Sequence, residues 1–323
     1  MTENAKLGKP PLVAALFHAV GPDGTCTLDP SVPGALWRAA LVEPAASFLA
    51  RPGKDLRARL VRTGWLLGGG DPEASDPEAI ARVLELLHAG SLIVDDVEDR
   101  STERRGEPAL HVLVGEPLAI NTGSWMYFWA LAELDRLAIP GALACAVAAL
   151  VRCHQGQALD LAACVSELAV ADVPAVVAAT TRLKTGALRR LAVELGAMAA
   201  GAPRPEIGEF GEAAGCALQM LDDLGSLVAP ARRHKAYEDL KAGRPTWPWA
   251  WLAGTCDRIA WDALVREQAL DVVAATLGTY VESIGRAAVR AQLDRAIAAL
   301  AFAPAVLVTA IAAELRRMET LYG

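Results

Sequence analysis

The sequence predicts an all-α protein, and three observations support that prediction. Apolar residues recur at three- and four-residue spacings over long stretches, notably 78–94, 142–165, 173–201, 205–227 and 262–300. Such spacing is typical of amphipathic helices. Breaks between these stretches carry proline and glycine, as at Pro140-Gly141. No alternating apolar and polar run of useful length predicts a strand, and no glycine-rich phosphate loop follows one.

Composition predicts one large helical domain with ample material for a core. The chain has 323 residues, of which 53% are hydrophobic and only 5% aromatic. Residues 1–40 carry scattered Gly and Pro, so we expect an irregular or partly helical lead-in there and the all-α domain over 41–323. The net charge of −7 argues against a nucleic-acid surface, which needs a basic face.

The composition also indicates a cytoplasmic protein without a transmembrane segment. None of the six cysteines forms a C-x-x-C pair, so they are interpreted as buried thiols. The first residues lack the basic-then-apolar pattern of a signal peptide. The longest uncharged run, between Arg295 and Glu314, contains Pro304, which favours two packed helices over a membrane span.

Two acidic clusters carry the functional prediction. The first is Asp-Asp-Val-Glu-Asp at 95–99, followed by Arg-Arg-Gly at 104–106, and the second is Asp222-Asp223. Asp95 and Asp99 are four residues apart and therefore share one helix face. Carboxylates are ligands that Mg²⁺ prefers, together with waters and substrate phosphates. The neighbouring basic residues point to a diphosphate ligand. No linker separates the clusters, so we expect them to face each other inside one domain.

Seven sequence blocks then carry a resemblance. In chain order they are EPAASFLARPGKDLRARL, LLHAGSLIVDDVEDRSTERRGEPALH, INTGSWMYF, HQGQALDL, LKTGAL, LQMLDDL and KAYEDLKAGRPTWP. Over about residues 41 to 320, the chain resembles the trans-isoprenyl diphosphate synthases, and most of all the geranylgeranyl diphosphate synthases of eukaryotic type. The resemblance implies a helical bundle of isoprenoid synthase type around a central apolar cavity, and a homodimer.

The resemblance also implies a role for each matching residue. The Mg²⁺ ligands, for three ions in all, would be Asp95, Asp96, Asp99, Asp222 and Asp223. The allylic diphosphate would be contacted by Arg104, Lys184, Thr185, Gln219 and Lys235. The homoallylic site, which binds isopentenyl diphosphate, would consist of Lys54, Arg57, His88 and Arg105. The floor of the chain-elongation cavity would be formed by Tyr127, Phe128 and His154.

The implied activity is a Mg²⁺-dependent prenyl transfer from an allylic prenyl diphosphate to isopentenyl diphosphate. The double bond of isopentenyl diphosphate is the nucleophile, so the reaction needs no nucleophilic side chain, and the sequence shows no Ser-His-Asp or Cys-His constellation. Gly90 and Ser91, just before the first cluster, are small and would let a C15 chain pass. We therefore expect C20 geranylgeranyl diphosphate as the product.

Two departures from the family pattern keep alternatives open. Ser226 stands four residues after Asp222, where the family usually has Asp or Asn, and Leu221 stands where a basic residue is usual. One alternative is a synthase-derived class I terpene cyclase, which ionises a prenyl diphosphate and closes rings. Another is a catalytically weak partner subunit of a heteromeric synthase. The complete homoallylic set favours elongation over cyclisation, and the intact first cluster argues against the weak subunit.

Overall fold

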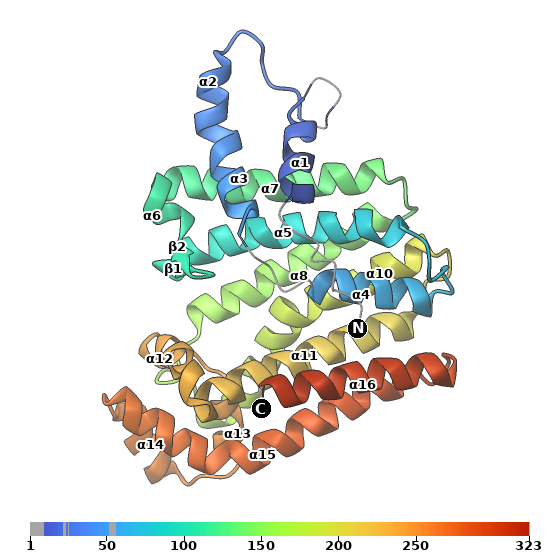
Figure 1. Cartoon of the computed structure of the whole chain (residues 1–323). Helices are drawn as coiled ribbons and strands as arrows, with labels where there is room; N and C mark the ends of the chain where they lie inside the picture. The colour runs from blue at the N-terminus through green and yellow to red at the C-terminus, as the bar shows by residue number, and fades with distance from the viewer. Residues whose placement is uncertain (1–9, 22–23, 25, 52–55, 323) are drawn as a thin grey trace. The chain divides into compact units, whose positions relative to one another are not determined.

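The prediction of an all-α fold is confirmed. A computed structural model describes residues 10–21, 24, 26–51 and 56–322, and within these ranges a single short hairpin accompanies the helices (Figure 1). The chain divides into two compact units. Unit 1 contains residues 1–146 and 198–202, and unit 2 contains residues 147–197 and 203–323. The separation of a lead-in at residue 41 stays a prediction.

Unit 1 is built around the long helix α5. Its elements are α1 (Pro10–Ala19), α2 (Gly34–Trp37), η1 (Arg38–Val42), α3 (Glu43–Leu49), α4 (Leu56–Leu67), α5 (Asp76–Glu98), β1 (Glu103–Arg104), β2 (Glu107–Pro108), α6 (Leu110–Val114) and α7 (Glu116–Arg136). Helix α5 lies between α4 and α7 and packs on both (Figure 1). Its apolar residues at three- and four-residue spacings, including Ile80, Leu84 and Leu87, are buried.

Two glycines let α5 and α7 approach closely. A Cβ added at Gly90 would lie 2.8 Å from the carbonyl oxygen of Gly123, and one added at Gly123 would lie 2.9 Å from the carbonyl oxygen of Gly90. The obstructing atoms belong to the backbone and cannot move aside cheaply. The small size of Gly90 therefore serves helix packing, whereas the sequence suggested that it leaves room for a substrate chain.

Gly90→Ala is expected to lower the free energy of unfolding by about 1–3 kcal/mol, the usual cost of overpacking a tight contact. Urea unfolding followed by circular dichroism measures the change. Gly278→Ala is the matched control, because Gly278 is a helical glycine with no atom within 4 Å of an added Cβ. That change should stabilise the helix by about 0.5–1 kcal/mol. Equal effects from the two variants would contradict the packing argument.

The hairpin after α5 positions the two adjacent arginines. Glu103 pairs with Pro108 and Arg104 with Glu107, so Arg105 and Gly106 form a two-residue turn. Both turn residues have positive φ, 59° and 78°, as a type I′ hairpin turn requires. The buried side chain of Arg51 binds the hairpin, since its Nη2 donates to the carbonyl oxygen of Pro108 at 2.8 Å.

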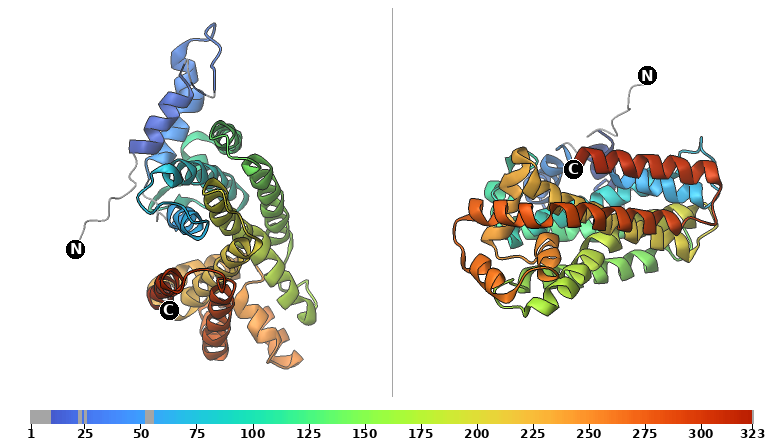
Figure 2. Two further views of the ribbon diagram at one scale, coloured as in Figure 1. Left: turned by 90° about the vertical axis from the view of Figure 1, so that its right-hand side faces the viewer. Right: turned by 90° about the horizontal axis from the view of Figure 1, so that it is seen from below.

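Unit 2 is built around the long helix α11. Its elements are α8 (Ala142–Ala162, which begins in unit 1), η2 (Val170–Asp172), α9 (Val173–Thr180), η3 (Thr181–Gly186), α10 (Ala187–Ala199, whose last residues belong to unit 1), α11 (Pro205–Val228), η4 (Pro230–Arg232), α12 (Arg233–Lys241), α13 (Trp247–Ala253), α14 (Arg258–Arg266), α15 (Leu270–Ala298) and α16 (Ala305–Tyr322). Helix α11 packs on α15, and α16 runs beside α15 (Figure 2).

Three local features of the described chain are a π-helical turn, the state of the cysteines and the absence of a membrane-spanning helix. Segment η3, Thr181–Gly186, is a π-helical turn, a feature that often marks functional positions. The six cysteines are half-buried thiols outside any disulfide, and burial raises the pKa of Cys153 and Cys216 to about 11. None of the helices in the described ranges combines the length and the apolar character that crossing a membrane would require.

Candidate functional site

The first acidic cluster lies at the C-terminal end of α5. Asp95 and Asp96 belong to the last turn, and Asp99 caps the helix with its N–H donating to the Asp95 carbonyl oxygen at 2.8 Å. Asp95 and Asp99 are half-buried, whereas Asp96 has an exposed fraction of 0%. A helix C-terminus carries partial negative charge, so carboxylates there are stabilised only by nearby cations.

Arg104 supplies one such cation. Its Nε donates to Asp96 Oδ1 at 2.6 Å, and its Nη2 contacts the same oxygen and also lies 3.5 Å from Asp95 Oδ2. Burial raises the pKa of Asp96 even though the guanidinium of Arg104 acts in the opposite direction. Asp96 Oδ2 is buried without a hydrogen-bond partner. Asp96 thus holds Arg104 in place, and Asp95 and Asp99 are the aspartates of this cluster that are partly exposed.

Some of the residues expected at the homoallylic site lie close together. Arg57 on α4 forms a bidentate pair with Glu85 on α5, at 2.9 and 3.0 Å. Arg105 lies close enough to Arg57 and Glu85 to interact with both charges. Burial lowers the pKa of Arg105 most, the charge of Glu85 raises this pKa, and the charge of Arg57 lowers it. His88 follows Glu85 by three residues on the same helix, and its Nδ1 lies 3.4 Å from Ser91 Oγ. Lys54 lies outside the described residues.

Glu85 was not selected from the sequence. Its position three residues before His88 on an amphipathic helix is the signal that could have identified it. The positive charges of Arg57 and Arg105 repel each other, and the carboxylate of Glu85 partly offsets both charges. The arrangement is a cationic group with one internal counter-ion.

The three residues expected to close the elongation cavity differ in exposure. Tyr127 on α7 is half-buried, Phe128 on α7 has an exposed fraction of 70%, and His154 on α8 is exposed. The neighbouring side chains of α7 explain the difference, because Met126 and Trp129 are the ones that point into the core of unit 1. An exposed side chain does not close a cavity within one chain unless another molecule covers it. The floor role of these residues stays a prediction.

The second acidic cluster lies near the C-terminal end of α11. Asp222 and Asp223 are both half-buried. Asp222 Oδ1 accepts a hydrogen bond from Arg232 Nη2, while Ser226 Oγ donates to the backbone carbonyl oxygen of Asp222 at 2.7 Å. The buried Ser226 hydroxyl therefore makes an internal hydrogen bond of α11. Arg232 was also missed by the sequence analysis, although it lies in the basic run Arg-Arg-His-Lys at 232–235.

A chain of hydrogen bonds holds the adjacent carboxylate. Thr185 Oγ1 donates to Gln219 Oε1 at 3.0 Å, and Gln219 Nε2 donates to Asp223 Oδ1 at 2.8 Å. The backbone N–H of Trp247 donates to Asp223 Oδ2 at 3.1 Å. Thr185 and Gln219, predicted to contact the allylic diphosphate, are thus brought together in unit 2 with Asp223, a predicted metal ligand, and Asp223 is fixed at both oxygens.

The two lysines predicted to contact the allylic diphosphate differ. Lys184 Nζ lies 2.7 Å from Asp160 Oδ2, so its charge already has a partner. Lys235 is exposed in the first turn of α12. Asp160 belongs to the block HQGQALDL, and its acidic side chain in that block is the signal that could have identified it.

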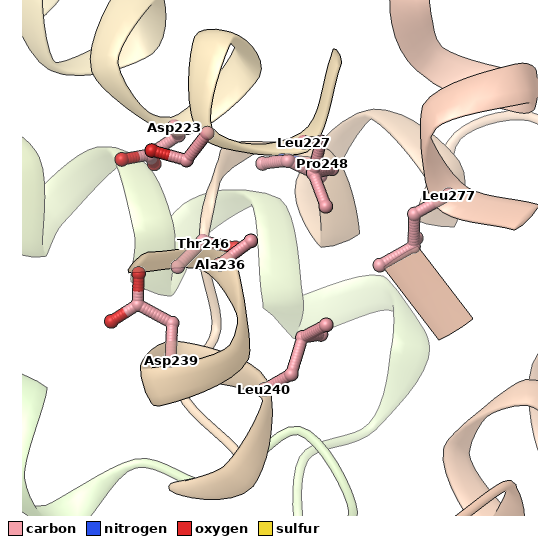
Figure 3. A pocket seen from close by; sticks show the side chains of 9 residues that line it. Asp223, Leu227, Ala236, Asp239, Leu240, Thr246, Pro248 and Leu277 are labelled. Carbon is pink, nitrogen blue, oxygen red and sulfur yellow. The ribbon is translucent and has the colours of Figure 1, made fainter. Parts of the chain in front are cut away.

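A small pocket beside α11 contains a further carboxylate. Asp223 and Asp239 lie along one side of it, and Leu227, Leu240 and Leu277 are among the other residues that line it (Figure 3). Burial and then the charge of Asp239 raise the pKa of Asp223 to about 8. Burial also raises the pKa of Asp239 to about 6, although Arg244, at 3.8 Å, acts against the shift. Both shifts arise mainly from burial, so a cation close by would favour the ionised form of these carboxylates.

Both clusters have the carboxylate oxygens that Mg²⁺ prefers, but the carboxylates of the second cluster are already paired with protein donors. Among the residues described, no group of three or more His, Cys, Asp or Glu side chains is assembled as a metal cage. Mg²⁺ does not need one, because it keeps several waters and binds one or two carboxylates plus substrate phosphates. Asp95 and Asp99 provide that number on one helix end. In the second cluster Asp222 is engaged by Arg232 and Asp223 by its two donors.

Solved structures share this fold. A decaprenyl diphosphate synthase from Rhodobacter capsulatus superposes with a TM-score of 0.77 at 22% identity, covering 98% of both chains. A polyprenyl synthase from Caulobacter crescentus, complexed with calcium and isoprenyl diphosphate, gives a TM-score of 0.74 at 22% identity, covering 96% of this chain and 92% of that one. The fold is therefore the all-helical fold of the isoprenoid diphosphate synthases.

Residues 38–269 match the polyprenyl synthetase family, and the chain belongs to that family. A geranylgeranyl pyrophosphate synthase from Fusarium fujikuroi is 35% identical over 210 residues, 64% of this chain and 49% of that protein. One from Hypoxylon pulicicidum is 33% identical over 213 residues, 63% of this chain and 52% of that protein. The chain thus matches about half the length of these relatives.

Proposed function

We propose that this chain is a trans-prenyltransferase that condenses an allylic prenyl diphosphate with isopentenyl diphosphate to give C20 geranylgeranyl diphosphate. One observation carries the proposal: two half-buried aspartates, Asp95 and Asp99, lie at the end of α5, and Arg104 is fixed in the same cluster by Asp96. The names of the fungal relatives and of the calcium-bound structural neighbour support this choice of substrates and of a divalent cation.

In the proposed site three Mg²⁺ ions bind, held by the first cluster and by Asp222 with Asp223. Bound Mg²⁺ neutralises the charge that develops on the diphosphate leaving group. The protein side chains bind and orient the diphosphate and the metal ligands. Arg104, Lys184 and Lys235 bind diphosphate oxygens, and Gln219 with Thr185 orients Asp223. Each well-placed donor to the leaving group contributes roughly 3–4 kcal/mol to lowering the barrier.

The homoallylic diphosphate is assigned to Lys54, Arg57, His88 and Arg105. Glu85 holds the guanidinium of Arg57 in a fixed orientation, so less side-chain entropy is lost when a diphosphate binds. The carbocation formed at the allylic partner is attacked by the isopentenyl double bond, and the released diphosphate takes the final proton. Water must be excluded while the cation exists.

A homodimer is part of the proposal. Several large apolar side chains of α6 and α7 are exposed on the single chain: Val112, Leu113, Ile120 and Phe128. A second copy that covered them would also shield Phe128, as a floor of the elongation cavity requires. A cytoplasmic location remains a prediction from composition.

The decisive experiment separates elongation from cyclisation. The protein is incubated with Mg²⁺, farnesyl diphosphate and labelled isopentenyl diphosphate, and diphosphate and hydrocarbon products are analysed separately. We expect labelled geranylgeraniol after phosphatase treatment and no product when isopentenyl diphosphate is omitted. A hydrocarbon formed from a prenyl diphosphate alone would replace the proposal with the cyclase alternative.

A further inference from the structure

The first acidic cluster lies at the end of α5 and the second lies in α11 before its last residue, Val228, and each is compensated by an arginine that follows it in the chain. At α5 the arginine is Arg104, eight residues after Asp96. At α11 it is Arg232, ten residues after Asp222. At α5 the carboxylates add to the partial negative charge of the helix C-terminus, and at α11 the two adjacent carboxylates repel each other. The guanidinium removes part of that electrostatic cost.

The local sequence explains why Arg232 reaches back to α11. Helix α11 ends at Val228, and Pro230 begins the short η4 turn, which reverses the chain. Proline suits the first position of such a turn because it needs no amide hydrogen there. The turn brings Arg232 Nη2 to Asp222 Oδ1 and to within 3.5 Å of the Asp222 carbonyl oxygen.

The two arginines differ in what they engage. Arg104 binds mainly the fully buried Asp96, which leaves Asp95 and Asp99 accessible at the end of α5. Arg232 binds Asp222 itself, whose side chain is 36% exposed. Asp223 already accepts hydrogen bonds at both oxygens, and Ser226 has no carboxylate to offer. A metal ion at this cluster would therefore need the Asp222 carboxylate beside Asp223, and Arg232 is the present partner of Asp222.

A guanidinium and a divalent cation compete for one carboxylate oxygen. We infer that Arg232 competes with the divalent cation for Asp222 and thereby sets a weak metal affinity at the second cluster. The inference rests on the proposed function, since it takes the second cluster as a metal site. An ion binding there must displace Arg232, and its apparent affinity falls by the fraction of molecules in which the pair is closed. The ion at the second cluster is then the last to bind.

The test measures metal binding and needs no turnover. The full chain is titrated with Mn²⁺ in the presence of inorganic pyrophosphate, and bound Mn²⁺ is followed by electron paramagnetic resonance and calorimetry. Asp222→Asn identifies the class of bound Mn²⁺ that depends on the second cluster. Arg232→Gln should tighten that class about tenfold, which corresponds to about 1.4 kcal/mol, and should leave tighter classes unchanged. Arg233→Gln is the matched control, because it removes the adjacent positive charge and leaves Arg232 in place.

The outcomes are separable. The inference is overturned if Arg232→Gln leaves the affinity of the Asp222-dependent Mn²⁺ class unchanged or weakens it. It is also overturned if Arg233→Gln tightens that class equally, or if neither the unaltered protein nor Arg232→Gln shows such a class. Appearance of the class only in Arg232→Gln supports competition strongly. Failure of the proposed function would show itself elsewhere, as absent condensation of farnesyl and isopentenyl diphosphates by a protein whose Mn²⁺ binding is intact.

Discussion

Replacing Asp95 with asparagine is expected to lower kcat by at least about 100-fold, the scale for losing one principal electrostatic stabiliser of a transition state. Asp95 is a partly exposed aspartate at the end of α5, and Arg104 Nη2 lies 3.5 Å from its Oδ2. Asparagine keeps the shape and one acceptor oxygen, but it lacks the charge that attracts a divalent cation. The measurement is the steady-state rate with farnesyl and isopentenyl diphosphates at saturating Mg²⁺.

The fold should survive this change. Asp95 contributes a half-exposed carboxylate at a helix C-terminus, where negative charge is unfavourable without a cation. Helical circular dichroism and the melting temperature in the absence of metal should therefore stay near those of the unaltered protein. Glu98→Gln is the control, since Glu98 is an exposed carboxylate of the same helix turn. A rate loss of similar size in Glu98→Gln, or near-normal turnover of Asp95→Asn, would remove Asp95 from the proposed metal site.

The sequence was sufficient for the fold because its signals are local and repeated. Apolar spacing predicted helices through 78–94 and 205–227, and the structure has α5 and α11 there. Helical spacing also places Asp96 on a different helix face from Asp95 and Asp99. A residue one position along a helix points about 100° away, so Asp96 turns into the core while Asp95 and Asp99 stay accessible.

Roles that depend on tertiary contacts could not be predicted in this way. Gly90 is small because the backbone of Gly123 passes close to it, and no local pattern encodes that approach. The pairing of Arg232 with Asp222 depends on the direction in which the η4 turn sends the chain. The exposure of Phe128 follows from which face of α7 packs against α5. In each case the deciding neighbour is remote in sequence or is set by a turn.

Removing Arg104 is expected to cost more stability than removing Asp96, although the two form one pair. Arg104→Ala leaves Asp96 fully buried, with its carboxylate deprived of the guanidinium that compensates it. Breaking a buried pair in this way costs about 3–5 kcal/mol, because an uncompensated charge remains inside. Asp96→Ala leaves Arg104 with a side chain that is 26% exposed and close to Asp95. Its guanidinium keeps water and a second carboxylate, so the loss should be smaller by at least about 1 kcal/mol, the scale of a typical hydrogen bond.

The comparison requires a rescue and a surface control. Asp96→Asn in the Arg104→Ala background removes the buried charge and should recover much of the lost stability, because the orphaned carboxylate is the source of the cost. Arg258→Ala breaks an exposed pair with Asp262 and should change the free energy of unfolding by less than about 1 kcal/mol. Urea unfolding of the four variants in metal-free buffer measures the series. If Asp96→Ala proves as costly as Arg104→Ala, or if Asp96→Asn brings no recovery, burial of the ionised Asp96 is not what makes Arg104 indispensable to unit 1.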